Sequence, residues 1–436
     1  MAVARVSTGY SPRLFQQEIH RARRRFSVVV CHRRFGKTVM AVNELIHEAL
    51  ACPHPRPRYA YVAPLYKQAK AAAWDYLKAY TAAVPGRQAH ETELRITLPG
   101  DRRIRLYGAD NPDSLRGIYL DGVVLDEYAQ MSPRVWTEVL RPALADRKGW
   151  AIFIGTPMGH NAFHDIFAHA REGYPDWWAA CFRASDTGVI DAAELAAARA
   201  AMGEDEYAQE FECSFEAAVK GAYYGRELAA AEAEARIGAV PYDPALPVHT
   251  AWDLGVGDAT AIWFVQLAGP RIHVIDYLEA TGEGLAWYAK RLAEKPYVYA
   301  AHHAPHDAMA REWGSGRTRE EQARALGIAF TIAPNVAVDD GINAVRAILP
   351  RCVFDAGRCG DGLEALRLYR KDWDDGRQAF RDHPRHDWTS HAADALRYLA
   401  LGLRDRYAPG PRVARTFGDA LVDHLKAGGR KGARRI

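Results

Sequence analysis

Three consecutive residues, Gly36, Lys37 and Thr38, lie in the stretch VVVCHRRFGKTVMAVNEL, between an apolar run and a helical pattern. A lysine and a hydroxyl in this order close the loop that cradles nucleotide phosphates, because the lysine reaches the β- and γ-phosphates and the hydroxyl ligates Mg²⁺. Residues 28–30 are three valines, typical of a buried strand. Apolar residues after Thr38 recur at helical spacing. The loop would therefore place a phosphate at a helix N-terminus, where free N–H groups favour it.

The match to a phosphate loop is incomplete at one position. Such a loop usually opens with a glycine five residues before Gly36, and this chain has Cys31 there. Glycine is common at that position because it adopts backbone angles that other residues avoid. An ordinary strand–turn–helix with a lysine in the turn is the alternative to a nucleotide site.

A pair of acidic residues follows another apolar run, in YLDGVVLDEYAQM. Asp126, at the end of this predicted strand, could hold Mg²⁺ opposite Thr38. Glu127 could polarise the attacking water. An acidic pair that caps the next helix is the alternative. The order of phosphate loop and Asp-Glu strand favours a site that hydrolyses ATP with Mg²⁺.

Three aspartates in the second half of the chain stand in settings that suit metal ligands. Asp253 interrupts an apolar strand pattern, where a carboxylate is unfavourable unless it is bound to something. Asp307 follows the end of a later strand, and Asp394 lies in the helical pattern SHAADALRYLA. Together they fit two Mg²⁺ or Mn²⁺ ions about 4 Å apart, one activating water and the other stabilising the leaving oxygen of a phosphodiester.

Polar residues near these aspartates could assist them. Asp258 is a candidate auxiliary ligand, and Asp387 and His391 are candidates from the region of Asp394. His391 and Asp394 are three residues apart, hence on one helix face. Solvated polar groups are the alternative for all three candidates. Histidines also cluster around Asp307 and Asp387, but no cysteine accompanies them. Groups that support the metal ligands, or contacts to phosphate, are therefore favoured over a zinc site.

Hydrophobic patterning divides the chain into two α/β parts. From about residue 26 to 215, apolar runs alternate with helical patterns, which predicts a parallel sheet. A helical stretch over 191–236 and the proline-rich VPYDPALPV come next, and strand-like runs joined by short turns then predict an antiparallel meander. We expect a first domain over 1–215, a connecting segment over 216–245, a second domain over 246–405 and a basic flexible tail over 406–436.

Composition limits the class of protein. With 49% hydrophobic and 25% charged residues and no long apolar run, the chain is typical of a globular protein without a membrane span. The N-terminus lacks a signal-peptide core. The six cysteines show no zinc or redox spacing, which predicts reduced thiols in a cytosolic compartment. The net charge of +3 does not indicate nucleic acid. The basic segment from Arg406 onward is either a binding tail or a solvated terminus.

In combination, these motifs resemble the large terminase subunit of tailed bacteriophages. The resemblance rests on YSPRLFQ, the R-R-x-G-K-T loop, YVAPLYKQAK, LRG before the Asp-Glu strand, IFIGTPMG after it, and HDWTSHAADALRY. It implies an additional-strand P-loop ATPase followed by an RNase H-like α/β nuclease domain, with Asp253, Asp307 and Asp394 as the nuclease carboxylates. The family tolerates departures at the first loop position, where Cys31 stands.

The resemblance also implies roles for single residues of the ATPase. Gln16 would read the adenine, and Arg116 would act on the ATP of a neighbouring subunit. Taken alone, Arg116 is equally well a solvated surface arginine. Arg33 and Arg34, in the phosphate loop, would contact the nucleotide. The residues that follow the strand after the Asp-Glu pair would couple hydrolysis to movement, and Thr156 would also contact the nucleotide: Gly155, Thr156 and Pro157.

The function implied by the resemblance is a DNA-packaging motor. It would hydrolyse ATP, drive double-stranded DNA into a prohead and cut the DNA with a metal-dependent endonuclease. The implied partners are the portal protein and the small terminase subunit. We expect a monomer in isolation, a ring on the prohead, and a location in the host cytoplasm without a membrane contact. A DNA repair or recombination ATPase-nuclease and a nucleotide-switched assembly protein are the alternatives, and Glu127 argues against the switch.

Overall fold

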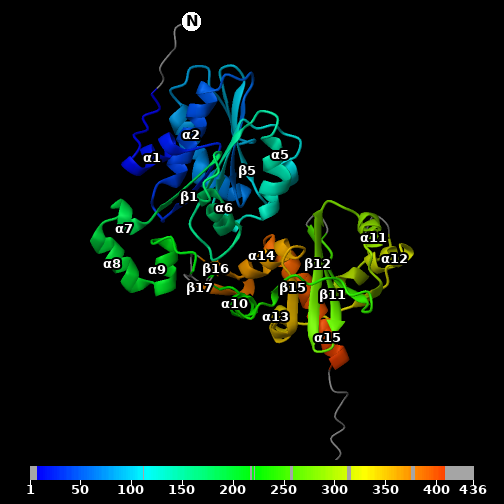
Figure 1. Ribbon diagram of the computed structural model, residues 1–436. Coiled ribbons are helices and arrows are strands. Elements are labelled where there is room, and N and C mark those ends of the chain that lie inside the picture. Colours follow the sequence, from blue (N-terminus) through cyan, green and yellow to red (C-terminus); the bar gives the residue numbers. More distant parts are fainter. Residues whose placement is uncertain are drawn as a thin grey trace, which may run out of the picture.

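The computed structural model describes residues 7–110, 112–216, 219, 221–255, 259–311, 316–374 and 379–407. Two large β-sheets with helices packed on them dominate the chain (Figure 1), the first formed before residue 183 and the second after residue 236. A short two-stranded sheet, β16 (Lys371–Asp374) and β17 (Ala379–Pro384), lies to the left of the second large sheet in the same view. The predicted division into two α/β parts is confirmed.

The first sheet is parallel except at one edge. Its order is β3-β4-β5-β2-β6-β7-β1-β8, with β3 and β4 antiparallel and the other neighbours parallel from β5 to β8. The central strands are buried on both faces, which is why they read as continuous apolar runs. The strands are β1 (Phe26–Cys31), β2 (Arg58–Ala63), β3 (Gln88–His90), β4 (Arg95–Leu98), β5 (Arg102–Gly108), β6 (Gly122–Asp126), β7 (Trp150–Gly155) and β8 (Trp177–Phe182).

Helices cover both faces of this sheet and extend beyond its β8 edge. One face packs on α2, and the other packs on the segment that follows β6 and on α6. The sheet therefore has a separate hydrophobic core on each face. Helices α7, α8 and α9 project to one side of the sheet in Figure 1. The helices are α1 (Leu14–Ala22), α2 (Lys37–Ala51), α3 (Tyr66–Ala69), α4 (Asp75–Thr81), α5 (Arg141–Ala143), α6 (Ala162–Arg171), α7 (Ala184–Thr187), α8 (Ala192–Ala201) and α9 (Glu204–Glu210).

Several short helical turns join these elements. Two of them are π-helical, at Lys70–Trp74 and at Val135–Leu140. Two are 3₁₀ turns, η2 (Pro112–Leu115) and η3 (Tyr128–Gln130), and η3 directly follows the Asp-Glu pair. The loop after each parallel strand is therefore short, which keeps the residues after β1, β6 and β7 at one edge of the sheet.

The second sheet is mixed. Strands β10, β11 and β12 form the predicted antiparallel meander, and β13 and β14 then add in parallel beside β10. This is the RNase H-like arrangement that the resemblance implies. The full order is β14-β13-β10-β11-β12-β15-β9. The strands are β9 (Ile237–Gly238), β10 (Val248–Asp253), β11 (Ala259–Ala268), β12 (Arg271–Thr281), β13 (Tyr299–Ala304), β14 (Phe330–Ile332) and β15 (Cys352–Asp355).

The helices of this second part also pack on both faces of their sheet. Helix α15 lies against β10 and β11, with α13 and α14 beside it, whereas α11 and α12 lie on the other side. The helices are α10 (Gly225–Ala233), α11 (Leu285–Ala293), α12 (Arg319–Ala325), α13 (Val338–Ile348), α14 (Gly360–Leu368) and α15 (Thr389–Tyr407), with 3₁₀ turns η5 (His306–Met309) and η6 (Leu349–Arg351).

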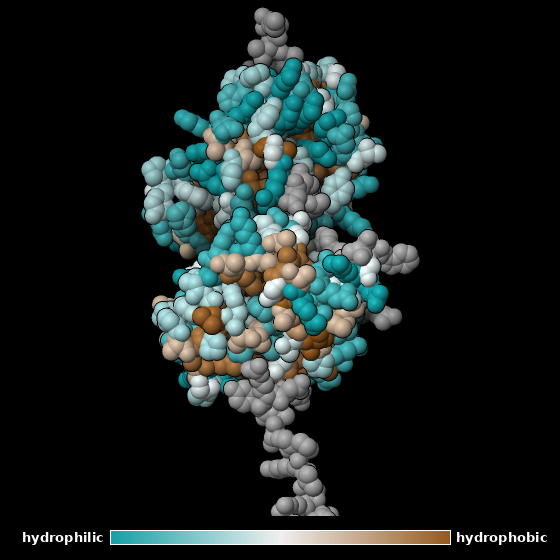
Figure 2. All heavy atoms as spheres, turned by 90° about the vertical axis from the view of Figure 1, so that its right-hand side faces the viewer, coloured by the Kyte–Doolittle hydropathy of each residue, from teal (hydrophilic) through white to brown (hydrophobic). Residues whose placement is uncertain are grey.

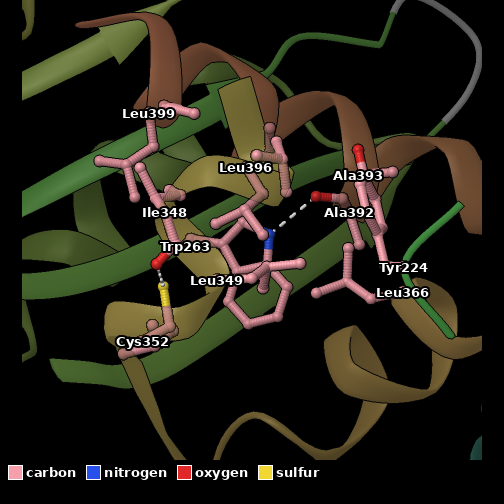
Figure 3. Close-up of a cluster of buried hydrophobic side chains, with 14 of the residues drawn as sticks. Tyr224, Trp263, Ile348, Leu349, Cys352, Leu366, Ala392, Ala393, Leu396 and Leu399 are labelled. Carbon is pink, nitrogen blue, oxygen red and sulfur yellow. Dashed lines mark hydrogen bonds between the residues drawn. The ribbon is translucent and has the colours of Figure 1, made fainter. Parts of the chain in front are cut away.

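Trp263, on β11, fixes helix α15 against the second sheet. Its indole is fully buried, and its Nε1 donates to the carbonyl of Ala392 at 2.8 Å (Figure 3). Gly362 leaves room for the ring, because a Cβ there would lie 2.3 Å from the indole. Leu396 and Leu399 pack in the same cluster. The hydrogen bond and the packing together set the position of the first turns of α15.

The segment before the second sheet packs with it. Within residues 216–245, which the sequence predicts as a connecting segment, Tyr224 and Leu228 lie in the same buried cluster as Trp263. Strand β9 pairs with β15 at the edge of the sheet. The predicted domain boundaries themselves stay a prediction, and the predicted basic tail lies outside the described residues from 408 onward.

The surface mixes polar and apolar side chains. On the face shown in Figure 2, hydrophilic side chains predominate over the upper part, and hydrophobic ones form small groups over the lower part. No helix in the described part of the chain has the length and apolarity needed to cross a membrane.

The two parts touch through polar contacts. Glu364 on α14 accepts the N–H of Ala162 at 2.8 Å, at the first turn of α6. Trp388 Nε1 donates to the carbonyl of Gln130 at 3.0 Å, shortly after the Asp-Glu pair. Glu364 is buried, and burial raises its pKa to about 7 against the opposing effect of the Ala162 N–H. The contact places a carboxyl group that titrates near neutrality between the two sheets.

We predict that Glu364→Gln makes the thermal stability less dependent on pH. The pKa of Glu364 is raised from 4.5 to about 7, so its contribution is fully present below the lower value and is lost as pH rises through the higher one. Glutamine keeps an acceptor for Ala162 without titrating. The melting temperature of the variant relative to wild type should rise between about pH 5 and about pH 8. The rise should be roughly 2–4 °C for each kcal/mol of stability that the wild type loses as Glu364 ionises. The exposed Glu294→Gln is the control, and a difference that is flat with pH would contradict the prediction.

Candidate active sites

The loop after β1 has the geometry of a phosphate cradle. Gly36, the N-cap of α2, has φ +89°, and a Cβ there would lie 2.9 Å from Gln16 Nε2. Glycine is required at this position for both reasons. Cys31, in place of the usual first glycine, is the last residue of β1 and is completely buried. Burial raises the pKa of its thiol to about 12. Cys31 thus acts as a core residue and leaves the rest of the loop intact.

The structure brings together the four polar residues that the sequence places in two separate motifs. Lys37 Nζ lies 2.6 Å from Glu127 Oε1, and Thr38 Oγ1 donates to Asp126 Oδ2 at 3.3 Å. Burial lowers the pKa of Lys37, but Glu127, Cys31 and Asp126 raise it by more, so the ammonium stays charged. The site holds a lysine, a hydroxyl and two carboxyl groups at the N-terminus of α2, which is the donor and acceptor set that phosphate and a hard cation need.

Asp126 is the most buried of these groups. Its side chain accepts hydrogen bonds from the Tyr61 hydroxyl and, at 3.0 Å, from the backbone N–H of Glu127. Burial and then Glu127 raise the pKa of Asp126 to about 6, against Lys37, Tyr61 and Thr38. Tyr61 was missed by the sequence analysis, because only the pairing of β2 with β6 places it beside Asp126.

A cavity of about 450 Å³ opens beside this cluster. It lies at the carboxyl ends of β1, β2, β6 and β7, where parallel α/β sheets bind ligands. Arg33 lines it and lies 3.7 Å from Glu210. Thr156 lines it as well, and its hydroxyl donates to the Cys31 carbonyl at 3.5 Å. The residues lining the cavity are Arg33, Lys37, Thr38, Ala63, Pro64, Gln68, Ala71, Ala72, Asp126, Glu127, Gln130, Thr156, Pro157, Met158, Gln209 and Glu210.

Gln16 and Arg34 stand apart from the cavity wall. Gln16 is 4% exposed and donates to the Gly36 carbonyl at 3.1 Å, while its own oxygen accepts the Arg13 N–H at 2.9 Å. Gln16 therefore supports the phosphate loop through a hydrogen bond to the loop backbone. Arg34 is exposed and has φ +70°. Their predicted contacts to a nucleotide stay predictions.

Arg116 lies in a different place from the other predicted ATPase residues. Its side chain is 60% exposed, 3.9 Å from Glu138, and lines a second cavity of about 550 Å³. That cavity also contains Arg134 from the first part and Glu279 and His391 from the second. Arg116 is thus directed away from the cradle of its own chain, and its action on a neighbouring subunit stays a prediction.

Two of the three predicted nuclease carboxylates lie together. Asp253, at the end of β10, is 3.2 Å from His391 Nδ1. Asp394 follows one turn later on α15, with Arg397 Nη2 at 3.3 Å. Burial raises the pKa of Asp394 to about 6, against the effect of Arg397, and Asp253 raises it further. A carboxyl pair of this kind is a suitable ligand set for a divalent cation.

Asp307, the third predicted carboxylate, lies apart from that pair. It lies in η5, after β13, with its side chain 55% exposed and 3.8 Å from Arg319. Its ligand atoms and those of Asp253 and Asp394 do not all come within 4.8 Å of one another. Arg319 also donates to the carbonyl of Leu254 at 3.2 Å, so Arg319 links Asp307 to the end of β10. The assignment of Asp307 as a metal ligand stays a prediction.

The auxiliary candidates separate into different roles. Asp387 accepts from the Thr389 N–H at 3.0 Å and the Thr389 hydroxyl at 2.6 Å, so it caps α15. His391 faces Asp253, as described above. Asp258 lies outside the described residues. His302, one of the clustered histidines, bonds Thr250 in the core, and burial lowers its pKa to about 4.

Glu279 is a further candidate that the sequence analysis missed. It lies on β12, lines the second cavity with His391, and bonds the Tyr277 hydroxyl. Burial raises its pKa, against Tyr277, His391 and Arg134. Arg134 also donates to the Glu279 carbonyl at 2.8 Å. A single glutamate in a strand gives no sequence pattern, so only the fold shows its position.

A sequence model of the terminase large subunit family, described as T4likevirus-type, N-terminal, matches residues 32–230. This part of the chain is therefore similar to the N-terminal part of large terminase subunits. Among curated large terminase subunits, that of Thermus virus P23-45 is 31% identical over 38% of this chain and 39% of its own length. That of Escherichia phage T5 is 26% identical over 86% of each chain. The chain thus aligns with less than two thirds of the Thermus relative.

Solved large terminases are also similar. The ATPase domain of the Thermus phage P74-26 large terminase has 28% identity and a TM-score of 0.43, over 48% of this chain and 95% of that one. The large terminase of a thermophilic bacteriophage has 15% identity and a TM-score of 0.42, over 92% of this chain and 99% of that one.

We predict that Tyr61→Phe destabilises the folded chain. The change removes a hydrogen-bond donor from the buried Asp126 carboxyl group, which costs about 1–3 kcal/mol. Calorimetry should show a lower melting temperature for the variant. Tyr66→Phe is the matched control, because the Tyr66 hydroxyl is near the surface and lies 3.5 Å from its acceptor. Equal melting temperatures for both variants would contradict the role given to Tyr61.

Proposed function

We propose that this chain is the ATP-driven motor subunit that packages double-stranded DNA into a viral prohead and cuts it with a metal-dependent endonuclease. The observation that supports this most directly is the cluster in which Lys37 meets Glu127 and Thr38 meets Asp126 beside one cavity. The match of residues 32–230 to the model of the terminase large subunit family supports the DNA-packaging role.

The residues around the first cavity fit Mg²⁺ and ATP. Thr38 and Asp126 offer hard oxygen ligands within 3.3 Å of each other, and they would hold Mg²⁺, which neutralises charge on the phosphates. Lys37 pairs with Glu127 in this structure. In our proposal Lys37 turns to the phosphates when nucleotide binds, and Glu127 is then free to orient and polarise water.

The second site would use the carboxyl groups of Asp253 and Asp394. Both are oxygen ligands of the kind that Mg²⁺ and Mn²⁺ prefer, and two such ions would supply an activated water and stabilise a leaving oxygen. His391, 3.2 Å from Asp253, would orient that carboxylate. Asp307 completes the set only if it leaves Arg319, and Glu279 is the alternative that the described residues offer.

The remaining proposals concern partners and location. We infer that the portal protein and the small terminase subunit are partners, that the chain is a monomer in isolation and forms a ring on the prohead, and that it works in the host cytoplasm. Arg116, directed away from its own cradle, would then reach the ATP of the next subunit. Thr156, which touches the loop through Cys31, would pass the state of the nucleotide to the following segment. Contacts to phosphates rather than bases would grip the duplex.

The ATPase proposal predicts that Glu127→Gln retains ATP binding but loses turnover. Removing a general base lowers the rate by about 10²- to 10⁴-fold. Phosphate release and binding of a fluorescent ATP analogue are the measurements, followed by packaging of DNA into purified proheads. Glu172→Gln, at the exposed end of α6, should behave as wild type. Near-normal hydrolysis by Glu127→Gln would refute the assignment.

The nuclease proposal predicts that Asp253→Asn and Asp394→Asn nearly abolish plasmid cleavage by the full chain and leave ATP hydrolysis intact. Each change removes a charged metal ligand, which the first site does not share. Comparing Asp307→Asn with Glu279→Gln identifies the third ligand, because only the true ligand should cause a loss of similar size. The exposed Asp340→Asn is the control. Cleavage by Asp253→Asn and Asp394→Asn at the wild-type rate would show that the site is misplaced.

A further inference from the structure

Three potential metal ligands lie together at a place that the proposed function does not use. Cys52 caps the end of α2, His54 follows in the next loop, and Asp121 directly precedes β6. His54 Nδ1 is 2.8 Å and Cys52 Sγ is 3.9 Å from Asp121 Oδ1. Among the residues that the structure describes, this is the one trio of histidine, cysteine or acidic side chains whose ligand atoms all lie within 4.8 Å of one another.

The cluster is separate from both candidate active sites. Asp121 precedes β6 and Asp126 ends it. Their positions differ by five residues, and five steps along a strand span roughly 17 Å. The trio therefore lies at the amino ends of the parallel strands, at the opposite edge of the sheet from the phosphate loop. No residue of the trio lines either cavity.

The chemistry of the trio selects among metals. A thiolate is a poor ligand for Mg²⁺ or Ca²⁺, whereas thiolate, imidazole and carboxylate together suit Zn²⁺. Zn²⁺ would balance the charges of one thiolate and one carboxylate. We propose that Cys52, His54 and Asp121 bind a zinc ion, with water as the fourth ligand.

The surroundings of Asp121 fit a metal ligand. The Arg58 N–H donates to Asp121 Oδ2 at 2.9 Å, which leaves Oδ1 directed at Cys52 and His54. Such a hydrogen bond to the second oxygen is the usual way in which a ligating carboxylate is oriented. The His54 side chain is 46% exposed, so an ion can enter from solvent.

Arg147 is the competitor for Asp121. Its Nη1 lies 3.5 Å from Asp121 Oδ1. If Asp121 pairs with Arg147 and binds no metal, the trio is only a network of hydrogen bonds. Arg147 also donates to the Pro55 carbonyl at 3.1 Å and lies 4.2 Å from the centre of the Tyr119 ring. These two contacts hold the guanidinium in place when the ion takes Oδ1.

A zinc ion here would join two segments that are distant in the chain. Cys52 and Asp121 are 69 residues apart. Binding would fasten the end of α2 to the start of β6, and since the site does not exist in the unfolded chain, its binding energy adds to stability.

The test uses the full chain, stripped of metal with a chelator and titrated with Co²⁺. We expect roughly one equivalent of Co²⁺ to bind with an absorption band from a sulfur ligand, and Zn²⁺ to remove the band and raise the melting temperature. Cobalt bound to the carboxylates of the proposed nuclease gives no sulfur band. The sulfur band therefore tests the trio even if the proposed nuclease site binds no metal. Plasma mass spectrometry of the purified chain should find zinc.

Variants locate the ion. Cys52→Ser should abolish the sulfur band. His54→Ala, at a residue whose side chain is 46% exposed, should weaken binding by at least about tenfold, because even the loss of a residue that only orients a ligand costs about that much. Cys181→Ser is the matched control and should keep the band, because Cys181 is a partly exposed cysteine outside the trio. A wild-type chain with no sulfur band, or a band that survives in Cys52→Ser, would overturn the proposal.

Discussion

A carboxyl group buried at the end of a central strand has to be compensated, and the arrangement of the first site follows from how Asp126 is compensated. Tyr61 comes from the neighbouring strand, Thr38 from the helix after the phosphate loop, and the Glu127 N–H from the next residue. The contact from Tyr61 requires that β2 lies beside β6 in the sheet. Once the partners of Asp126 are in place, Glu127 has a left-handed backbone, with φ +55°, and its side chain meets Lys37.

The second site depends on the first part of the chain more than its distance in sequence suggests. Trp263 holds α15 on its own sheet, while Trp388, just before α15, bonds the carbonyl of Gln130. Gln130 is three residues after Glu127. Arg134, a few residues further on, bonds Glu279. A short series of polar contacts therefore links the segment after Glu127 to the carboxylates of the second site.

Local patterns predicted what local chemistry determines. The GKT triplet, the strand-end Asp-Glu pair, the alternation of strands and helices, and the antiparallel meander are all visible in the sequence. Strand order is not visible, and it decides that Tyr61 meets Asp126 and that Cys52 and His54 meet Asp121. Asp307 shows the converse: its place after a strand was correctly predicted, but the distance to Asp394 depends on how η5 turns and on Arg319.

The packing of Tyr224 and Leu228 with Trp263 has a consequence for the evolution of such chains. The core of the second sheet includes residues that precede the proline-rich stretch by more than ten positions. A recombination event that exchanges the C-terminal part between related genes preserves the second core only when the crossover falls before Tyr223. A junction placed at the prolines would combine a helix from one lineage with a sheet from another, and the recombinant would inherit a mismatched core.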